Sequence, residues 1–417
     1  MFSGFSGERN HSEWRQTVRT IGIRHRVKKT QDGEAHPTQL CIIGESGVTK
    51  TYDLDTEDHE LDFLLGRFPI SWKILPEGEK PSENVLPHHQ LVWGKSFKVP
   101  SVYDGLISGD RVAMTLGGSG DYFAFALSLH GEKIGAEVLR IPPAVLKDRR
   151  GEADKSGDAS LLANLLQNEP GIFLSTTPKD RDLIRLQRAY RDLETIRKDR
   201  VACEQRIHSR AIGQIFCAED LYSAGTLEVE IKKLQASDAT LALLKKEETR
   251  VAKLVEVTLE SFPVWTEVLS QVDGCGVKIA ARIIAGIGDV RRFRNKAKFK
   301  AFSGVHLVQV GESKEFGLAR RRAGVQANWS DLVRQGFYLL VDQFVKNEDS
   351  EWGQRFRAIK VEFLRRHPEP MDVPGKKGKS YSKGHIHRMA IWRTATKFAE
   401  WLYREWSRLE KQAEVEV

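Results

Sequence analysis

The sequence predicts an α/β N-terminal half followed by a helical C-terminal half. Residues 17–54 contain three short runs that are rich in β-branched residues or alternate apolar with polar residues, which is typical of an antiparallel meander of strands. Strand-like and helix-like segments then alternate as far as residue 175, as they do in a layered α/β domain. From Pro178 onward, apolar residues recur at spacings of three and four, which indicates helices instead.

The segments between the meander and residue 175 can be assigned in order. Residues 58–68 carry leucines at helical spacing and should form a helix. A strand should follow at 111–118, and another at 136–141, where Pro142 and Pro143 stop it. Between these two strands, we expect a helix over the intervening apolar segment.

That intervening helix should cover residues 120–135. Tyr122, Phe125 and Leu129 fall on one face of it, so they should be its buried side. Gly131 should mark its end, because glycine favours helix C-termini.

The C-terminal half divides into three expected parts after an α/β domain at 1–175. Residues 176–262 should form a helical pair, which is either a coiled-coil arm or two ordinary helices that pack on a neighbouring domain. Residues 263–345 should form a compact helical unit, and 346–417 a basic linker with a C-terminal amphipathic helix. The apolar stripe of that last helix is Ile391, Ala395, Phe398, Leu402, Trp406 and Leu409.

Composition indicates a soluble intracellular protein. Lysine and arginine total 65 against 57 aspartate and glutamate residues, for a net charge of +8, and no run approaches the length of a membrane span. The N-terminus does not resemble a signal peptide, so we expect a cytoplasmic protein. The cysteines have no CxxC spacing, which argues against a disulfide framework or a cysteine zinc site. They are Cys41, Cys203, Cys217 and Cys275.

The segment from Ser270 to Val305 carries the strongest functional signal. An apolar-x-Gly-x-Gly turn at 272–276, between two helix-like runs, predicts a helix–hairpin–helix in which backbone N–H groups meet a phosphate. Between Val290 and Arg322 there are ten Lys or Arg residues against two acidic ones, interleaved with aromatic residues. This pattern favours a nucleic-acid backbone site over a solvated basic face. The predicted contacts are Gly274, Gly276, Lys278, Arg291, Arg292, Arg294, Lys298, Arg320, Arg321 and Arg322.

The same segment resembles the C-terminal domain of insertion-sequence-110 family transposases, also called the IS116/IS902 group. The matching residues are Gly288-Asp289, Arg292-Phe293 and Ser303-Gly304-Val305, followed downstream by Ser313, Arg320 to Arg322 and Gly324. In the N-terminal half, residues 119–148 and the run "DASLLANLL" are similar to further family segments. The resemblance therefore spans most of the chain.

This resemblance implies a RuvC-like, ribonuclease-H-type N-terminal domain, with carboxylates that hold a divalent metal such as Mg²⁺. It also implies DNA strand cleavage and rejoining during transposition or site-specific recombination. The implied partners are DNA, a structured guide RNA and further copies of the chain. The copies would contact one another through the helical arm. The implied location is the bacterial cytoplasm, at the nucleoid.

The family's carboxylate pattern is incomplete in this sequence. Arg24 stands where the first carboxylate should close the first strand, and Gly117 stands in the second position. Glu45 fits the second strand better than the first. The remaining catalytic and metal-binding candidates are Asp154 and Asp158, which could equally be a solvated charge and a helix N-cap, with Ser156 as another cap. We therefore predict that no three carboxylates converge at these strand ends.

The resemblance implies a serine nucleophile in the C-terminal domain, and Ser313 is the candidate. Arg320, Arg321 and Arg322 could neutralise the charge that develops on the attacked phosphate. The alternative is a loop serine without a role, because Lys314 replaces the glycine expected after it.

Two functions from different classes remain. The first is a transposase or recombinase, and the second is a catalytically degenerate descendant that binds DNA or RNA as a regulator. A hairpin-containing repair or Holliday-junction factor is a third option.

Overall fold

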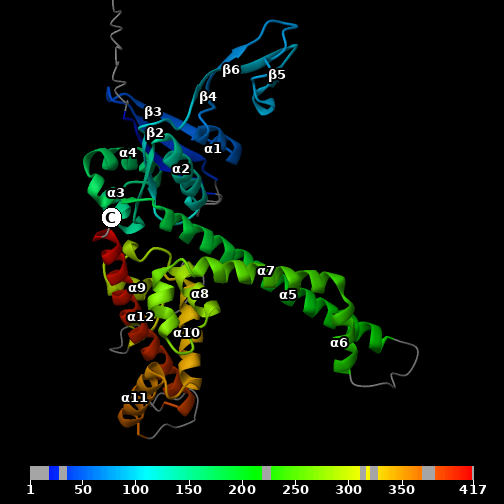
Figure 1. The fold of residues 1–417 in the computed structure, drawn as a ribbon, viewed down its shortest axis with the longest axis vertical. Helices are drawn as coiled ribbons and strands as arrows, with labels where there is room; N and C mark the ends of the chain where they lie inside the picture. The colour runs from blue at the N-terminus through cyan, green and yellow to red at the C-terminus, as the bar shows by residue number, and fades with distance from the viewer. Residues whose placement is uncertain are drawn as a thin grey trace, which may run out of the picture. The chain divides into compact units, whose positions relative to one another are not determined.

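The computed structural model divides the chain into two compact units, Met1–Arg181 and Asp182–Val417 (Figure 1). The boundary lies close to the end of the predicted α/β domain. The structure describes residues 18–27, 35–217, 227–309, 316–319, 327–368 and 381–415. Among the helices in these ranges, none is long and apolar enough to cross a membrane.

A mixed sheet forms the centre of the first unit, in the strand order β3-β2-β1-β7-β8-β9. Its strands are β1 (Thr20–Arg24), β2 (Thr38–Ile43), β3 (Thr49–Leu54), β7 (Arg111–Thr115), β8 (Glu137–Ile141) and β9 (Leu174–Ser175). β1, β2 and β3 pair antiparallel, so the predicted meander is confirmed. β7 pairs parallel with β1 and β8 parallel with β7, which places their C-terminal ends at one edge of the sheet.

Helices cover both faces of this sheet. They are α1 (Glu57–Leu64), α2 (Asp121–Ile134), α3 (Pro143–Arg150) and α4 (Asp158–Asn168). Ile21 and Ile23 of β1 pack with residues of α1 and α2 on one face. Gly22, between them, faces α4, and a Cβ there would run into the backbone of Ala159 and Ala163. Alternation along β1 therefore separates the two layers, and glycine lets α4 lie directly against the strand.

Two details of the predicted helices are wrong. The buried face of α2 contains Phe123, Ala124 and Leu127, whereas Tyr122 is half exposed. The helix also passes Gly131 and ends at Gly135, which adopts the left-handed conformation that a C-terminal cap needs.

The start of α4 also differs from the prediction, because neither Ser156 nor Asp158 is its N-cap. The cap position is Gly157, without a side-chain hydrogen bond, and Asp154 instead caps the short 3₁₀ helix η2 (Lys155–Gly157).

A separate small sheet, which the sequence did not predict, follows α1. β4 (Phe68–Ile74), β6 (Ser96–Asp104) and β5 (Leu91–Trp93) pair antiparallel, and the 3₁₀ helix η1 (Pro87–His89) precedes β5. In Figure 1 this extension projects away from the main sheet of the same unit.

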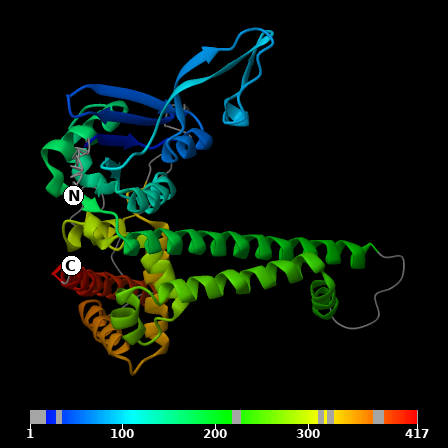
Figure 2. The ribbon, with the colours of Figure 1, turned by 45° about the horizontal axis from the view of Figure 1, so that its top comes forward.

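Long antiparallel helices form the arm of the second unit (Figure 2). α5 (Pro178–Phe216) and α7 (Ala239–Leu259) lie side by side, and α6 (Leu227–Ser237) lies at the far end of the arm. The spacing of three and four along the sequence predicts an apolar stripe of Leu183, Leu186, Tyr190 and Leu193; the last three are buried and Leu183 is half-buried. A second predicted stripe, Leu244, Val251 and Leu254, is only partly correct. Leu254 is 48% exposed, and Val251, Val255 and Leu259 form the buried stripe of α7.

The rest of the second unit is helical, as predicted. Its elements are η4 (Val264–Val268), η5 (Leu269–Gln271), α8 (Val277–Ile287), η6 (Val290–Arg292), α9 (Lys296–Phe302), the β10–β11 ribbon (Leu307–Gln309 and Phe316–Leu318), α10 (Asp331–Lys346), α11 (Glu351–Arg366) and α12 (Lys383–Val415). The segment before the glycine turn is a π-helical turn and a 3₁₀ turn rather than one helix, because Val268 leaves helical geometry at φ −120° and ψ −65°.

One core joins the arm's base to α8, α10 and α12, so the parts that the sequence separates belong to one unit. All members of the predicted apolar stripe of α12 are buried. The helix begins at Lys383, inside the segment expected to be a basic linker.

Candidate functional site

The edge where β1 and β7 end holds no carboxylate at the two positions that the resemblance named first. Arg24 is the last residue of β1, and its Nε atom is buried without a hydrogen-bond partner among the described residues. Gly117 and Gly118 follow β7 with φ angles of 83° and 99°, which are left-handed conformations that let the chain turn into α2.

Asp158 lies at the start of α4 and is buried. Its two oxygens accept hydrogen bonds from Arg150, Oδ1 from Nε at 2.6 Å and Oδ2 from Nη2 at 3.0 Å. This paired geometry is the strong, planar arrangement that arginine forms with a carboxylate. The guanidinium therefore takes the oxygens that a metal would need.

Asp154 is exposed and accepts a hydrogen bond from the Ser156 amide at 3.0 Å. Hydrogen bonds from Ser156 and the Lys155 amide, with a contribution from the positive charge of Arg24, lower the pKa of Asp154 to about 2. Glu45 accepts a hydrogen bond from the Val18 amide at 3.2 Å.

These carboxylates do not fit a Mg²⁺ site. Within the ranges that the structure describes, no group of three potential ligands contains Asp154, Asp158 or Glu45. Mg²⁺ requires convergent oxygen ligands, so we assign no chemical step to a metal at this edge.

The two glycines of the turn in the second unit have different surroundings. Gly274 has a φ of 83°, and a Cβ there would press on Gln343 of α10 and on Asn347, the C-cap of that helix. Gly276 is the N-cap of α8, has no side-chain cap, and would place a Cβ in open space among the described residues. Gly274 thus serves the turn and its packing, whereas the backbone at Gly276 remains accessible to a ligand.

Lys278 lies on the first turn of α8 and lines a groove of about 540 Å³ between α5, α7 and α8. Other basic residues of this groove are already paired. Arg197 and Arg200 both donate to Glu248, at 3.1 and 2.6 Å. The positive charge of this groove is therefore largely balanced within the arm.

A second groove, of about 910 Å³, lies between η6 and the C-terminal part of α12. We call it the η6–α12 groove; its lining residues are Val290, Arg291, Phe293, Tyr403, Arg404, Ser407, Arg408, Glu410, Lys411 and Gln412. Basic side chains outnumber the single acidic one in this lining, and two aromatic side chains accompany them. Tyr403 donates a hydrogen bond to the Phe293 carbonyl at 3.1 Å, which holds η6 against α12.

The predicted cations around η6 are held in different ways. Arg291 donates to the Asp289 carboxylate, with Nη2 to Oδ2 at 2.7 Å. The Arg292 guanidinium lies over the Phe302 ring, 4.7 Å from its centre. Arg294 and Lys298 are exposed. Of the predicted contacts, Arg291 lines the η6–α12 groove, whereas Lys278 lines the arm groove.

Arg404, Arg408 and Lys411 are basic residues that the sequence reading missed. They recur at spacings of four and three along α12, so they share one face of that helix. This basic stripe lies beside the apolar stripe of α12, and both follow helical spacing in the sequence.

The predicted nucleophile Ser313 and the arginines Arg320, Arg321 and Arg322 lie outside the described residues.

Comparison with protein families identifies one segment of the second unit. Residues 266–326 match the family described as Transposase IS116/IS110/IS902 family. The match confirms the resemblance to insertion-sequence-110 family transposases for this segment, which contains the glycine turn, η6, α9 and Ser313, and it supports a transposase or recombinase role. No curated protein matches the sequence.

Proposed function

We propose that the chain is a DNA-binding transposase or site-specific recombinase that holds the DNA backbone in the η6–α12 groove. The observation that carries this proposal is the basic lining of that groove, part of which belongs to the segment that matches a transposase family.

The chemistry of the groove suits a phosphate backbone. Arg404, Arg408 and Lys411 lie on consecutive turns of α12, so their charges follow a line along which successive phosphates can bind. Arg408 donates to Glu405 at 3.2 Å and to Gln412 at 3.0 Å, and it would exchange these partners for a phosphate. Arginine also pairs with phosphate through two parallel N–H donors. Contacts of this kind do not distinguish bases, so the proposed grip is independent of sequence.

In the active form of this proposal, Ser313 is the nucleophile. Its hydroxyl attacks a phosphodiester, the serine oxygen–phosphorus bond forms, and a deoxyribose hydroxyl leaves. Attack by a hydroxyl of the recombining strand then releases the serine. Arg320, Arg321 and Arg322 would stabilise the charge that develops on the phosphate. The proposed partners are DNA, a structured guide RNA and further copies of the chain.

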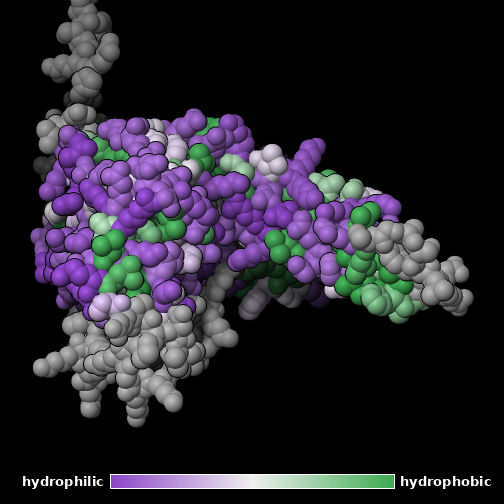
Figure 3. Space-filling view, turned by 90° about the horizontal axis from the view of Figure 1, so that it is seen from below, coloured by the Kyte–Doolittle hydropathy of each residue, from purple (hydrophilic) through white to green (hydrophobic). Residues whose placement is uncertain are grey.

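The arm supports the proposal of self-association. Val229, Leu234 and Leu243 are exposed near its far end. Figure 3 shows apolar surface in that part of the arm. Coiled-coil pairing would cover such side chains.

A degenerate descendant that binds DNA or RNA without cutting it is the second candidate. Arg24 at the end of β1 and the Arg150–Asp158 ion pair favour it, because both put guanidinium groups where the resemblance implies a metal-binding carboxylate set. The RuvC-like, ribonuclease-H-type assignment of the first unit, which its mixed sheet supports, would then describe ancestry rather than activity.

DNA binding is tested with charge reversal in the η6–α12 groove. We expect the variant Arg404→Glu/Lys411→Glu to bind a fluorescent duplex of random sequence more weakly and to reduce the slope of log affinity against log salt by about 2, one for each lost phosphate contact. Fluorescence anisotropy at several salt concentrations measures both quantities. Lys73→Glu/Lys95→Glu, at two exposed positions outside the groove, changes the charge by the same amount; it is the matched control and should bind as the wild type does.

Equal binding and an equal salt slope in the double variant would contradict this interface. Cleavage is tested separately, by recombination between the DNA ends of the element that encodes the chain. The active form predicts product with wild type and none with Ser313→Ala, whereas Asp158→Ala should retain product if Asp158 binds no metal. Wild-type protein that binds DNA but forms no product would favour the degenerate descendant.

A further inference from the structure

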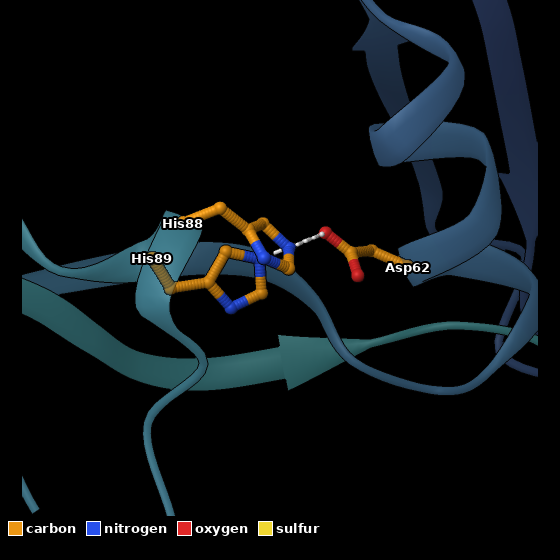
Figure 4. Close-up of side chains that lie close together, drawn as sticks. All are labelled: Asp62, His88 and His89. Carbon is orange, nitrogen blue, oxygen red and sulfur yellow. Dashed lines mark hydrogen bonds and ion pairs between the residues drawn. The ribbon is translucent and has the colours of Figure 1, made fainter.

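Three potential metal ligands converge in the first unit, away from the edge of the main sheet (Figure 4). Asp62 comes from α1, and His88 and His89 come from η1. The Nε2 atoms of His88 and His89 lie 3.0 and 2.8 Å from Oδ2 of Asp62. One ligand atom from each residue lies within 4.8 Å of the others, and within the described ranges this is the group with that property.

An arginine hydrogen-bonds the second oxygen of the Asp62 carboxylate. Arg67 donates a hydrogen bond from Nε to Oδ1 of Asp62 at 2.8 Å. This contact fixes the carboxylate and leaves Oδ2 to face the imidazoles. An outer partner of this kind is typical of carboxylates that ligate metals.

The three side chains of the cluster differ in how far they are exposed to solvent. The side chains of Asp62 and His89 are 1% and 3% exposed, whereas that of His88 is 46% exposed. The cluster is therefore anchored in the protein on one side and open to an ion from solvent on the other.

The ring of His89 is held by both long strands of the extension. Trp72 of β4 contacts it edge-on, with ring centres 6.3 Å apart, and Tyr103 of β6 lies at 5.9 Å. Its Nδ1 atom is buried without a hydrogen-bond partner among the described residues. The packing, rather than a second hydrogen bond, therefore orients this ring.

Both oxygens of the Asp62 carboxylate have hydrogen-bond partners. Burial raises the pKa of Asp62, but the hydrogen bonds from His88, His89 and Arg67 outweigh burial, so this pKa lies below its ordinary value. For His88 and His89 to bind an ion through Nε2, each ring must carry its proton on Nδ1, which leaves an Nε2 lone pair facing Oδ2 of Asp62.

We propose that Asp62, His88 and His89 bind a first-row transition-metal dication of the Zn²⁺ class. Two imidazole nitrogens and one carboxylate oxygen suit such ions, whereas Mg²⁺ and Ca²⁺ prefer oxygen ligands throughout. In a tetrahedral zinc site, bonds of about 2.0–2.2 Å separate neighbouring ligand atoms by about 3.3 Å, so the two distances from Nε2 to Oδ2 of Asp62, 3.0 and 2.8 Å, would need to open by a few tenths of an ångström. Water from the His88 side would supply the fourth ligand.

The role of this site is to fasten the extension to the main body of the first unit. Asp62 belongs to α1, which packs on the main sheet, and the histidines belong to the chain between β4 and β5. A bound ion would therefore join segments 26 residues apart at the base of the extension. The site is independent of the proposed DNA groove and of any metal expected at Asp154 and Asp158.

The alternative without a metal is a hydrogen-bonded triad. In that case both imidazoles keep a proton on Nε2 and donate it to Oδ2 of Asp62. Because the two arrangements share the same atoms, metal binding by full-length protein distinguishes them.

The experiment uses full-length protein that has been treated with a chelator and then dialysed. Co²⁺ is titrated while visible absorption is recorded, because tetrahedral Co²⁺ with nitrogen ligands gives intense d–d bands, and Zn²⁺ is then added as a competitor. We expect saturation at one Co²⁺ per chain, displacement by Zn²⁺, and no displacement by excess Mg²⁺. His88→Gln, at a half-exposed position, should weaken Co²⁺ binding at least tenfold without loss of folding, and Asp62→Asn should do the same.

His130→Gln, a half-buried histidine of α2 outside the cluster, is the matched control and should bind Co²⁺ as the wild type does. Failure of wild-type protein to give the d–d bands would overturn the proposal and leave the hydrogen-bonded triad. Equal affinity in His88→Gln, Asp62→Asn and wild type would also overturn it, because the ion would then lie elsewhere. Circular dichroism of each variant shows whether the fold is retained.

Discussion

Two buried carboxylates of the first unit, Asp158 and Asp62, differ in how many of their oxygens accept hydrogen bonds from arginine. Asp158 stands at a position where the family resemblance implies a metal ligand, yet Arg150 takes both of its oxygens. Asp62 stands at no expected position, yet Arg67 takes one oxygen and leaves the other facing two imidazoles. The hydrogen-bond partners of a carboxylate, rather than its burial or its place in a motif, decide whether it can ligate a metal.

The surroundings of the two carboxylates explain the difference. Arg150 ends α3 and reaches the start of α4, so a cation is built into the place where a metal would bind. Near Asp62, the short helix η1 brings two histidines side by side, with ring centres 4.2 Å apart. A fixed guanidinium excludes an ion, whereas neutral imidazoles can bind one.

The largest expected effect comes from Gly22→Ala. A Cβ at this position would collide with the backbone of Ala159 and Ala163, so α4 must move away from β1. We expect the free energy of unfolding to fall by about 3 kcal/mol or more, as in severe overpacking. Hydrogen–deuterium exchange should rise in α4, which carries Asp158, and much less in α1, which carries Asp62. Equal increases in both helices would show that the two carboxylate regions are not independent.

Arg150→Ala should be the next most severe change. It leaves the buried Asp158 carboxylate without its partner, at a cost of about 3 kcal/mol in the free energy of unfolding. The double variant Arg150→Met/Asp158→Leu removes both charges and should recover most of that loss. Urea unfolding measures both. A loss as large in the double variant as in Arg150→Ala would mean that packing, not the unpaired charge, is responsible.

Asp62→Asn should cost less in metal-free buffer. The change weakens the hydrogen bonds from Arg67, His88 and His89, and we expect a loss of about 2 kcal/mol in the free energy of unfolding. If Asp62 ligates a metal, Zn²⁺ should raise the melting temperature of the wild type but not of this variant. Thermal unfolding with chelator and with Zn²⁺ provides the measurement. The same Zn²⁺ shift in both proteins would speak against ligation by Asp62.

Asp154 should give the smallest effect, because it is exposed. Asp154→Ala should lower the unfolding midpoint only slightly at neutral pH, because solvent screens the contribution of an exposed carboxylate. Its carboxyl should titrate near 2 in the folded protein, below an ordinary aspartate near 3.8, so the stability that it contributes is present above about pH 4 and is lost as the pH falls through 2. An NMR titration of the side-chain carboxyl carbon follows this directly. A midpoint at the ordinary value would show that the cap on η2 is not formed.

Local patterns explain which elements could be predicted. The meander of β1, β2 and β3, the buried stripe of α12 and the helix α8 each follow from the period of their apolar residues. The β4–β6 pair was harder to recognise. Residues 70–74 alternate apolar with polar residues, but the run is short, and register shifts between Pro69 and Trp72 interrupt its pairing with β6. Ile74, Val102 and Tyr103 of these strands are also exposed rather than part of a core.

Contacts between distant segments explain what could not be predicted. The Asp62 cluster brings together α1 and η1, whose ligand residues are 26 positions apart, and Arg291 and Lys411 line the same η6–α12 groove. Neither contact can be recognised from the spacing of residues along the chain. The sequence did indicate that Arg24 and Gly117 replace carboxylates, since that statement needs only the identity of the residue at the end of a strand.

The sequence by itself determined the α/β and helical halves, the basic segment after the glycine turn and its likeness to a transposase family. These properties are local, because hydrophobic period, turn residues and charge are read from neighbours along the chain. Only the tertiary structure decided that Asp158 is bound by Arg150, that Gly274 packs on α10 while Gly276 stays open, and that Asp62 meets two histidines. The physical reason is that each of these contacts depends on which segments, distant along the chain, the fold places next to one another.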